Sequence, residues 1–338
     1  MKRRIVITLL AVVMLVVVWV IPACNTQTPQ TTFLKVNDYP LYTANLYEDY
    51  HFDDYLKTGI LPFSPTIPPI LRTNGQPTVD DFSCTCFSAY NLPNQAIFGR
   101  NYDWTNDFPA LLLFTHPTNG YASVSMVDMA VLGSAIDQQQ LIYAPYVPFD
   151  GMNERGLAVG MMAVPWAQAP IDANKVTINL VSAIRLMLDN AQSVDEAIAL
   201  LGEYNIDFLG HPIHYLIADA GGNSVVVEFI GGDIRVIHNE QSWQVSTNTI
   251  LSGMLDFVSV LCPRYGTAYQ TLEQAQGQMS HEDAMALLKK VAQPLQNYLG
   301  PTKTIWSTVY DMSTGEIEIV MDRHYDQVYR FKLDMKKK

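Results

Sequence analysis

Cys84 stands where two charged side chains can be brought next to its thiol. Arg100 follows it by sixteen residues and Asp103 by nineteen, with Ser83 immediately before it. A free thiol has a pKa of about 8.5, and a nearby Arg cation lowers that pKa by stabilising the nucleophilic thiolate. The carboxylate of Asp103 can orient a base beside the thiol. These residue types are suited to nucleophilic catalysis by Cys84, although the spacing alone favours the alternative of a buried Cys and a surface ion pair.

A β-hairpin is the element that must place these groups together. Residues 84–90 and 95–102 read as strands, and 91–94, with its Asn-Leu-Pro-Asn sequence, as the turn. The hairpin folds Arg100 and Asp103 back toward Cys84. Strict strand alternation puts the two on opposite faces, so both reach one site only if the strand bends or ends near Tyr102. We expect Arg100→Ala and Asp103→Ala to reduce turnover far more than stability.

An ordered set of short motifs resembles the choloylglycine hydrolase family of linear amide hydrolases, and equally the related penicillin acyltransferase-like group. The first match is Cys84-Thr85 followed by Gly99-Arg100-Asn101-Tyr102-Asp103. Further matches, in the family's order, are Asp150-Gly151-Met152-Asn153-Glu154-Arg155-Gly156-Leu157, His214-Tyr215-Leu216-Ile217-Ala218-Asp219, Ser246-Thr247-Asn248, Pro263-Arg264-Tyr265 and Trp306-Ser307-Thr308-Val309-Tyr310-Asp311. Each motif is weak alone, but the ordered set extends from Cys84 nearly to the C-terminus.

The resemblance implies an α+β fold, an αββα four-layer N-terminal-nucleophile hydrolase sandwich with mostly antiparallel sheets. It also implies that cleavage of the Ser83–Cys84 bond exposes the nucleophile. The roles that carry over are these: Cys84 is the nucleophile and its freed α-amine the base, Arg100 and Asp103 flank it, Asn248 donates to the oxyanion, and Arg264 completes the charged pocket. The implied substrate is a small-molecule N-acyl amide, and neither a cofactor nor a metal is required.

The chemistry is coherent on the residues themselves. An α-amine has a pKa of about 7.7–8.0, so a useful fraction is neutral near neutral pH and can accept the thiol proton. One departure from the family pattern is Ala163, at the position where the bile-salt-hydrolase branch has an Asn that helps form the oxyanion hole. A backbone N–H could serve there instead. This departure leaves the acyl and amine specificity open.

Other interpretations of the same residues stay open. The same site could act as an acyltransferase, or the chain could be a catalytically silent binding lipoprotein, although Arg100, Asp103 and Asn248 are all present. Cys84 and Cys86 make a weak metal pair because no second Cys pair accompanies them. His211 and His214 read as structural. A papain-like pairing of Cys84 with His214 lacks the expected Cys-Gly-Ser-Cys-Trp surround.

The remaining pattern predicts two sheets with helices outside. Strands are expected near 110–115, 121–126, 157–164, 213–219, 223–230, 234–239, 243–247, 305–311, 316–322 and 327–333. Helices are expected at about 175–190, from Ser193, at 263–275 and at 281–292, with capping-box patterns at Ser193 and Ser280. The order lacks the strict alternation of a parallel α/β fold, so antiparallel sheets fit better.

The N-terminus predicts export. Lys2, Arg3 and Arg4 precede an apolar run over 5–23, and Cys24 follows in a context that resembles a bacterial lipoprotein cleavage box. Residues 1–24 are therefore interpreted as a signal peptide or membrane anchor. Residues 25–83 are interpreted as a tether and Pro-rich leader lying on the surface, and 84–338 as the hydrolase domain. Both N-terminal alternatives place the protein outside the cytoplasm, secreted or membrane-anchored.

Composition narrows the class of partner. The formal net charge of −12 argues against nucleic acid, and a charged fraction of 16% argues against disorder. The 4 cysteines are too few for a disulfide scaffold, and a Cys86–Cys262 bridge stays open. A homo-oligomer is compatible with the sequence, which does not fix the oligomeric state.

Overall fold

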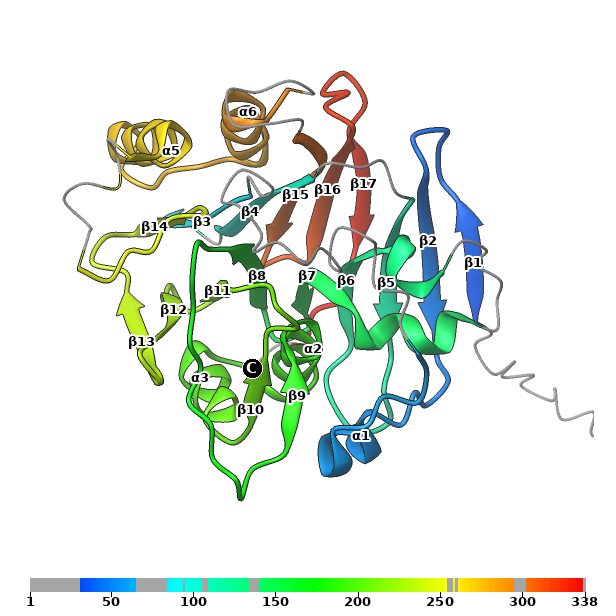
Figure 1. Ribbon diagram of the computed structural model, residues 1–338. Helices are drawn as coiled ribbons and strands as arrows, with labels where there is room; N and C mark the ends of the chain where they lie inside the picture. The colour runs from blue at the N-terminus through cyan, green and yellow to red at the C-terminus, as the bar shows by residue number, and fades with distance from the viewer. Residues whose placement is uncertain are drawn as a thin grey trace, which may run out of the picture.

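Two β-sheets face each other, and helices cover both outer faces, in the computed structural model (Figure 1). The structure describes residues 31–64, 84–93, 95–104, 109–133, 140–253, 258, 261–294 and 302–336. The predicted signal segment, Cys24 and Ser83 lie outside these residues. Among the described residues, no helix combines the length and apolar character needed to cross a membrane.

The larger sheet has nine strands in the order β1-β2-β5-β6-β7-β8-β11-β12-β13. Every neighbouring pair is antiparallel except β2 and β5. Its strands are β1 Thr32–Lys35, β2 Leu41–Leu46, β5 Ala110–Thr115, β6 Ser123–Asp128, β7 Pro148–Asn153, β8 Leu157–Ala163, β11 Ile213–Asp219, β12 Ser224–Ile230 and β13 Asp233–His238.

The smaller sheet has six antiparallel strands in the order β14-β3-β4-β15-β16-β17. Its strands are β3 Thr85–Leu92, β4 Gln95–Trp104, β14 Trp243–Ser246, β15 Lys303–Asp311, β16 Glu316–Met321 and β17 Tyr329–Lys332. The predicted hairpin is confirmed as β3 and β4, which pair antiparallel. The sheet is central to the site because β3 follows Cys84 directly.

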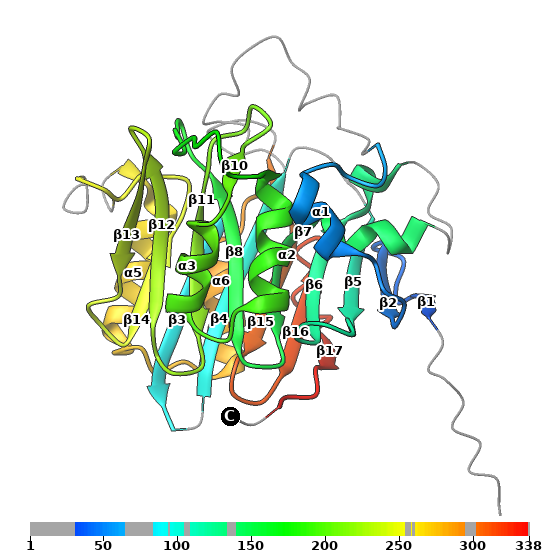
Figure 2. The same cartoon turned by 90° about the horizontal axis from the view of Figure 1, so that it is seen from below.

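Helices complete the four layers. α2 Leu180–Asn190 and α3 Val194–Leu201 pack on the nine-stranded sheet, and α5 Pro263–Gln274 and α6 His281–Val291 pack on the six-stranded sheet (Figures 1 and 2). The predicted αββα sandwich of mostly antiparallel sheets is therefore confirmed. The capping box at Ser280 is complete. At Ser193 the hydroxyl caps α3, but the side chain of Glu196 bonds the N–H of Gln192 instead.

The first helix of the predicted pair begins later than its apolar pattern suggests. Asn179 caps α2, and its side-chain oxygen accepts from the N–H groups of Val181 and Ser182 at 3.1 and 2.8 Å. The preceding Thr177–Asn179 is strand β9, which pairs with β10 Asn205–Asp207. A polar N-cap residue thus ends the extended segment and starts the helix.

The segment before Cys84 differs from the predicted surface leader. Residues 31–64 contribute strands β1 and β2 and helix α1 Phe52–Thr58. Leu41, Leu46 and Tyr55 are at most 3% exposed, so this segment is part of the core. The Pro-rich composition that suggested irregular structure is concentrated in residues 62–69, which mostly lie outside the described residues.

Strand β7 was not predicted, because Pro148, Asp150 and Gly151 are typical of turns. Gly151 crosses so close to β6 that a Cβ there would lie 2.5 Å from the carbonyl oxygen of Val124. Asp150 is fully buried and takes part in an ion pair across the two sheets. Neither Gly nor Asp is favoured in a strand by itself. Here the close approach of β6 accounts for Gly151, and the ion pair with the facing sheet accounts for Asp150.

Candidate active site

Cys84 lies directly before β3, between the two sheets, with 4% of its surface exposed. Its Sγ is 3.8 Å from Nη2 of Arg100, which lies on the neighbouring strand β4. The backbone carbonyl of Asp103 is 4.0 Å from the same sulfur. The hairpin therefore brings together the three residues that the sequence singled out.

A buried ion pair fixes the guanidinium of Arg100. Its Nε donates to Oδ2 of Asp150 at 2.9 Å, and its Nη1 donates to the carbonyl of Met161 at 2.5 Å. Asp150 also accepts from Trp306 Nε1 at 3.1 Å and from the hydroxyl of Tyr310 at 2.5 Å. With both carboxylate oxygens engaged, Asp150 acts as a positioning residue that aims Arg100 at Cys84.

Asp150 belongs to the candidate site through its ion pair with Arg100, and the sequence analysis did not single it out. In the sequence it appeared only as the first residue of the Asp150–Leu157 motif. The signal available in the sequence was a carboxylate beside an apolar residue, because a carboxylate that becomes buried needs a cationic partner. The pairing itself joins residues fifty positions apart and depends on how the sheets face each other.

Gly160 allows the two sheets to approach at this point. A Cβ at that position would lie 2.8 Å from Sγ of Cys86 and 3.2 Å from Cδ of Arg100. The side chain of Cys86 accepts from Nη1 of Arg100 at 3.2 Å. Any larger residue at Gly160 would push against the guanidinium, so this glycine is part of the site's geometry.

The thiol of Cys84 is held in its neutral form. Burial raises its pKa above the ordinary value, and the positive charge of Arg100 only partly opposes that rise. The lowering expected from Arg100 alone is therefore outweighed by desolvation, which disfavours the thiolate. A base must remove the proton during attack, and the thiol does not ionise on its own in this state.

Asp103 presents its backbone carbonyl to the thiol of Cys84, and its side chain bonds the neighbouring strand β15. Oδ1 accepts from the hydroxyl of Thr304 at 2.5 Å, whereas Oδ2 has no hydrogen-bond partner within the described residues. Burial raises the pKa of this carboxyl to about 7, with Arg264 and Thr304 acting in the opposite direction. β4 does not end near Tyr102 but continues to Trp104, and the register irregularity here lies in β15, between Thr304 and Trp306. Asp103 reaches the thiol through its backbone carbonyl, which strand alternation does not restrict.

Arg264 and Asn248 close the site from the other side. Arg264, in the first turn of α5, donates through Nη1 to the carbonyl of Cys84 and to Oγ1 of Thr85, the latter at 3.1 Å. Its Nη2 donates to Oδ1 of Asn248 at 3.1 Å. Nδ2 of Asn248 donates to the carbonyl of Ala163 at 2.8 Å. All five predicted residues, Cys84, Arg100, Asp103, Asn248 and Arg264, therefore form one connected cluster.

The resemblance implies that Asn248 is an oxyanion donor, and such a donor acts mainly in the transition state. Asn248→Ala is therefore expected to lower kcat by about 10²–10³-fold with little change in KM. The amide nitrogen carries two N–H groups, and Ala163 takes only one. Steady-state kinetics with a hydrolysed N-acyl amide measure the split, and circular dichroism checks folding. An effect confined to KM would show that Asn248 binds substrate instead.

The remaining cysteines and His214 take structural positions. Cys86 and Cys262 are both free and buried, so the bridge left open by the sequence is not formed. His214 lies between Glu228, 3.3 Å from Nδ1, and the carbonyl of Thr247, 2.6 Å from Nε2. These contacts occupy both ring nitrogens of His214.

A mostly apolar cavity of about 170 Å³ opens beside Cys84. It lies between the sheets and the start of α2, and Leu61 of the N-terminal segment forms part of its wall. Cys84 and Arg100 supply polar groups to it, together with Asp128, Asn179 and His211. Its apolar walls are formed by Leu61, Tyr102, Trp104, Val131, Val147, Phe149, Met161, Ala163, Leu180, Val181, Leu209 and Ile213. The geometry suits an apolar group bound next to a nucleophile.

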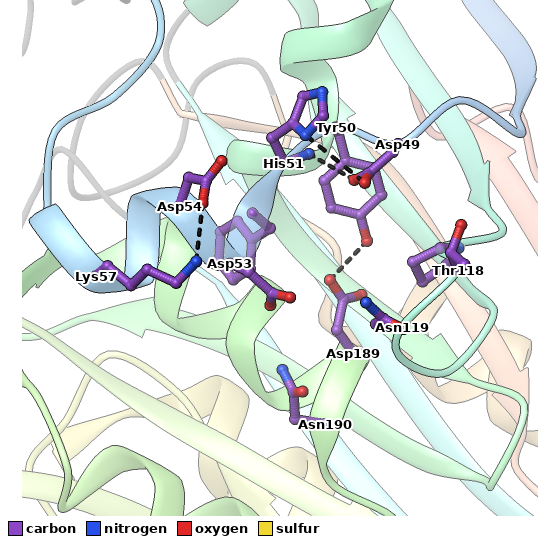
Figure 3. Close-up of a pocket in the computed structure, with 12 residues that line it drawn as sticks. Asp49, Tyr50, His51, Asp53, Asp54, Lys57, Thr118, Asn119, Asp189 and Asn190 are labelled. Carbon is purple, nitrogen blue, oxygen red and sulfur yellow. Dashed lines mark hydrogen bonds and ion pairs between the residues drawn. The ribbon is translucent and has the colours of Figure 1, made fainter.

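A second pocket, beside α1, is polar and shares no residue with the first (Figure 3). Lys57 is paired with Asp54 at 2.9 Å, and the hydroxyl of Tyr50 donates to Asp189 at 2.6 Å. Polar side chains of this pocket thus bond one another, and none of the residues that contact Cys84 lines it. We assign the chemistry to the cavity beside Cys84.

The fold is similar to that of two solved proteins. Penicillin V acylase from Agrobacterium tumefaciens has a TM-score of 0.58 at 21% identity, over 75% of this chain and 88% of that one. A conjugated bile acid hydrolase variant from Clostridium perfringens has a TM-score of 0.59 at 16% identity, over 75% and 93%. The fold is that of the N-terminal-nucleophile hydrolases.

The family follows from the sequence match. The acyl-coenzyme A:6-aminopenicillanic acid acyl-transferase family matches residues 90–326, and the chain belongs to that family. A penicillin V acylase from Pectobacterium atrosepticum is 25% identical over 177 residues, which cover 46% of this chain. The matched region spans 46% of the length of that relative.

Proposed function

We propose that the protein is an amidase that cleaves linear C–N bonds of N-acyl amides through a thioester on Cys84. The observation that carries the proposal is the single cluster of Cys84, Arg100, Asp103, Asn248 and Arg264 beside an apolar cavity. The family to which the chain belongs, and its relatedness to a penicillin V acylase, support the same reaction class.

The mechanism requires that the Ser83–Cys84 bond be cut first. While it is intact, the nitrogen of Cys84 is an amide and cannot accept a proton at neutral pH. Cleavage makes it an α-amine with a pKa of about 8, which can take the proton of the neutral buried thiol. Oδ2 of Asp103, which has no hydrogen-bond partner among the described residues, is available to hold the new amine. We therefore propose that Asp103 orients the base.

Each half of the reaction then balances. The thiol gives its proton to the α-amine and attacks the amide carbonyl, while Asn248 donates to the oxyanion. The α-amine passes that proton to the nitrogen of the substrate amide, and the C–N bond breaks. The substrate amine leaves, and the acyl group remains on Cys84 as a thioester. Water attacks the thioester next, and the α-amine acts as base a second time, releasing the carboxylic acid and restoring the thiol.

Active protein is expected to carry Cys84 as an N-terminal residue. Cys84→Ala should remain uncut and inactive, because it lacks both the attacking atom for self-cleavage and the nucleophile for turnover. Cys84→Ser, which keeps a hydroxyl, should be cut slowly. Intact mass and N-terminal sequencing of purified protein measure the cut. Full activity in a chain whose Ser83 is still joined to Cys84 would refute the mechanism.

Acyl transfer is the second candidate, favoured by the description of the matching family. The thioester would then be attacked by an amine in place of water. Product analysis with and without an added amine separates the two reactions: a new N-acyl product at the expense of free acid identifies transfer, and free acid alone identifies hydrolysis.

We also propose that residues 1–24 direct the protein out of the cytoplasm, and that a tether can hold it at the membrane. The proposal is supported by the basic start and apolar run that precede Cys24. Fractionation of cells that express the full chain is expected to find it in the membrane or extracytoplasmic fraction. Recovery of the native protein from the soluble cytoplasm would contradict export.

A further inference from the structure

Asp128 is the one carboxylate on the wall of the cavity beside Cys84, within the described part of the chain. It ends β6, and its side chain is N-cap of the short helix η3 Met129–Leu132, with Oδ1 accepting from the N–H of Ala130 at 2.9 Å. Only 3% of the residue is exposed. The reaction proposed above does not use this group.

The second oxygen of Asp128 is poorly satisfied. Within the described part of the chain, Oδ2 accepts one hydrogen bond, from the hydroxyl of Tyr102 at 3.4 Å. An ionised carboxylate offers about four acceptor positions, and a buried acceptor without partners costs free energy. Burial raises the pKa of this carboxyl to about 7, with Ala130 and Tyr102 opposing the rise. A bound hydrogen-bond donor would relieve that cost.

Tyr102 sets where Asp128 lies relative to the chemistry. Its ring lies under the guanidinium of Arg100, with 5.6 Å between Cζ and the ring centroid, and its hydroxyl points to Asp128. One phenol side chain therefore separates the charged end of the cavity, at Cys84, from the carboxylate. The walls beside it are apolar.

The enclosed cavity suits the acyl half of the substrate. After the amine leaves, the acyl group stays bonded to Sγ of Cys84, which lines the cavity. An acyl chain that extends along the apolar wall would carry its far end toward Asp128.

We propose that Asp128 determines specificity at an acyl subsite for an elongated apolar acyl group whose far end carries an uncharged hydrogen-bond donor, such as a hydroxyl, and that it rejects acyl groups ending in a carboxylate. The inference rests on the proposed amidase function. A donor would bond the open oxygen. A second carboxylate would lose its hydration in this apolar cavity and, above about pH 7 where Asp128 is ionised, would also be repelled.

The test uses three acyl amides of one amine. A series of unsubstituted chains first identifies the length that is hydrolysed fastest. Plain, ω-hydroxy and ω-carboxy chains of that length are then compared by kcat/KM. Wild type is expected to prefer the hydroxy over the carboxy chain by at least about tenfold, as one charged contact can provide. Asp128→Asn, which keeps the capping oxygen, should reduce this ratio by about tenfold.

Two further variants separate recognition from capping. Asp128→Ser retains an N-cap residue without the carboxylate, and should lower the hydroxy-to-carboxy ratio as Asp128→Asn does. Asp219→Asn is the matched control, because Asp219 is also a buried carboxylate that accepts backbone N–H groups, from Gly221 and Val194, but it lies outside the cavity. It should leave the ratio unchanged.

The outcomes are distinguishable. An unchanged ratio in both Asp128 variants would overturn the subsite and leave Asp128 as a helix cap, while hydrolysis of plain acyl amides would still support the amidase. Failure of the wild-type protein, cut at Ser83–Cys84, to hydrolyse any acyl amide would overturn the proposed function and the subsite together.

Discussion

Arg100→Met is expected to lower kcat/KM by at least about 10²-fold and to lower the free energy of unfolding by about 3–5 kcal/mol. The loss of turnover follows from removing the cation 3.8 Å from Cys84 Sγ. The loss of stability follows because Asp150, fully buried and 2.9 Å from Nε, would lose its partner and must either stay charged without compensation or take up a proton. The expectation of a selective loss of turnover for Arg100 is therefore revised.

A double variant separates the two effects. Arg100→Met with Asp150→Asn removes both charges, so most of the stability should return while turnover stays low. Denaturant unfolding measures the first quantity and kcat/KM the second. Recovery of activity along with stability would show that the cation is not needed for chemistry. If the single variant loses turnover at unchanged stability, the buried pair contributes less than its burial implies.

The N-terminal segment is expected to remain bound after the Ser83–Cys84 bond is cut. Leu41, Ala44, Leu46, Phe52 and Tyr55 are 0–5% exposed. Each large apolar side chain contributes about 1.5–3 kcal/mol when buried, and a domain is stable by only about 5–15 kcal/mol in total. The segment's burial is thus comparable to the whole stability.

Hydrogen bonds tie the same segment to the site. The hydroxyl of Tyr55 accepts from the backbone N–H of Asn179 at 3.0 Å, at the N-cap of α2, and the hydroxyl of Tyr50 donates to Asp189 at 2.6 Å. Leu61 lines the cavity beside Cys84. Losing the segment would therefore disturb the cavity as well as the sheet edge.

The measurement is native size-exclusion chromatography of cut protein, followed by denaturing gel analysis. Both fragments should elute together, and a chain expressed from Cys84 onward should be insoluble or inactive. A chain that lacks only residues 1–30 is the control and should fold normally. Fully active protein from which the N-terminal fragment has separated would contradict the prediction.

Local sequence pattern predicted most of the elements that carry the site. Alternation and turn residues located the β3–β4 hairpin, and apolar periodicity with polar caps located α3, α5 and α6 near their observed bounds. These features depend on neighbours three or four residues away, or on the two-residue repeat of a strand. Residues 41–46 and 148–153 were missed because their strand character comes from partners far along the chain, β5 for β2, and β6 and β8 for β7.

The sequence by itself determined which residues gather at the site, through an ordered set of motifs that includes Cys84, Arg100, Asp103, Asn248 and Arg264. Only the tertiary structure decided how they are arranged and how far they are buried. The packing of one sheet on the other pairs Arg100 with Asp150 and buries Cys84 enough that desolvation outweighs the nearby cation. It also turns the carbonyl of Asp103 toward the thiol and places Asp128 in the cavity. Pair distances and solvent exclusion depend on contacts between distant segments, and no local pattern encodes them.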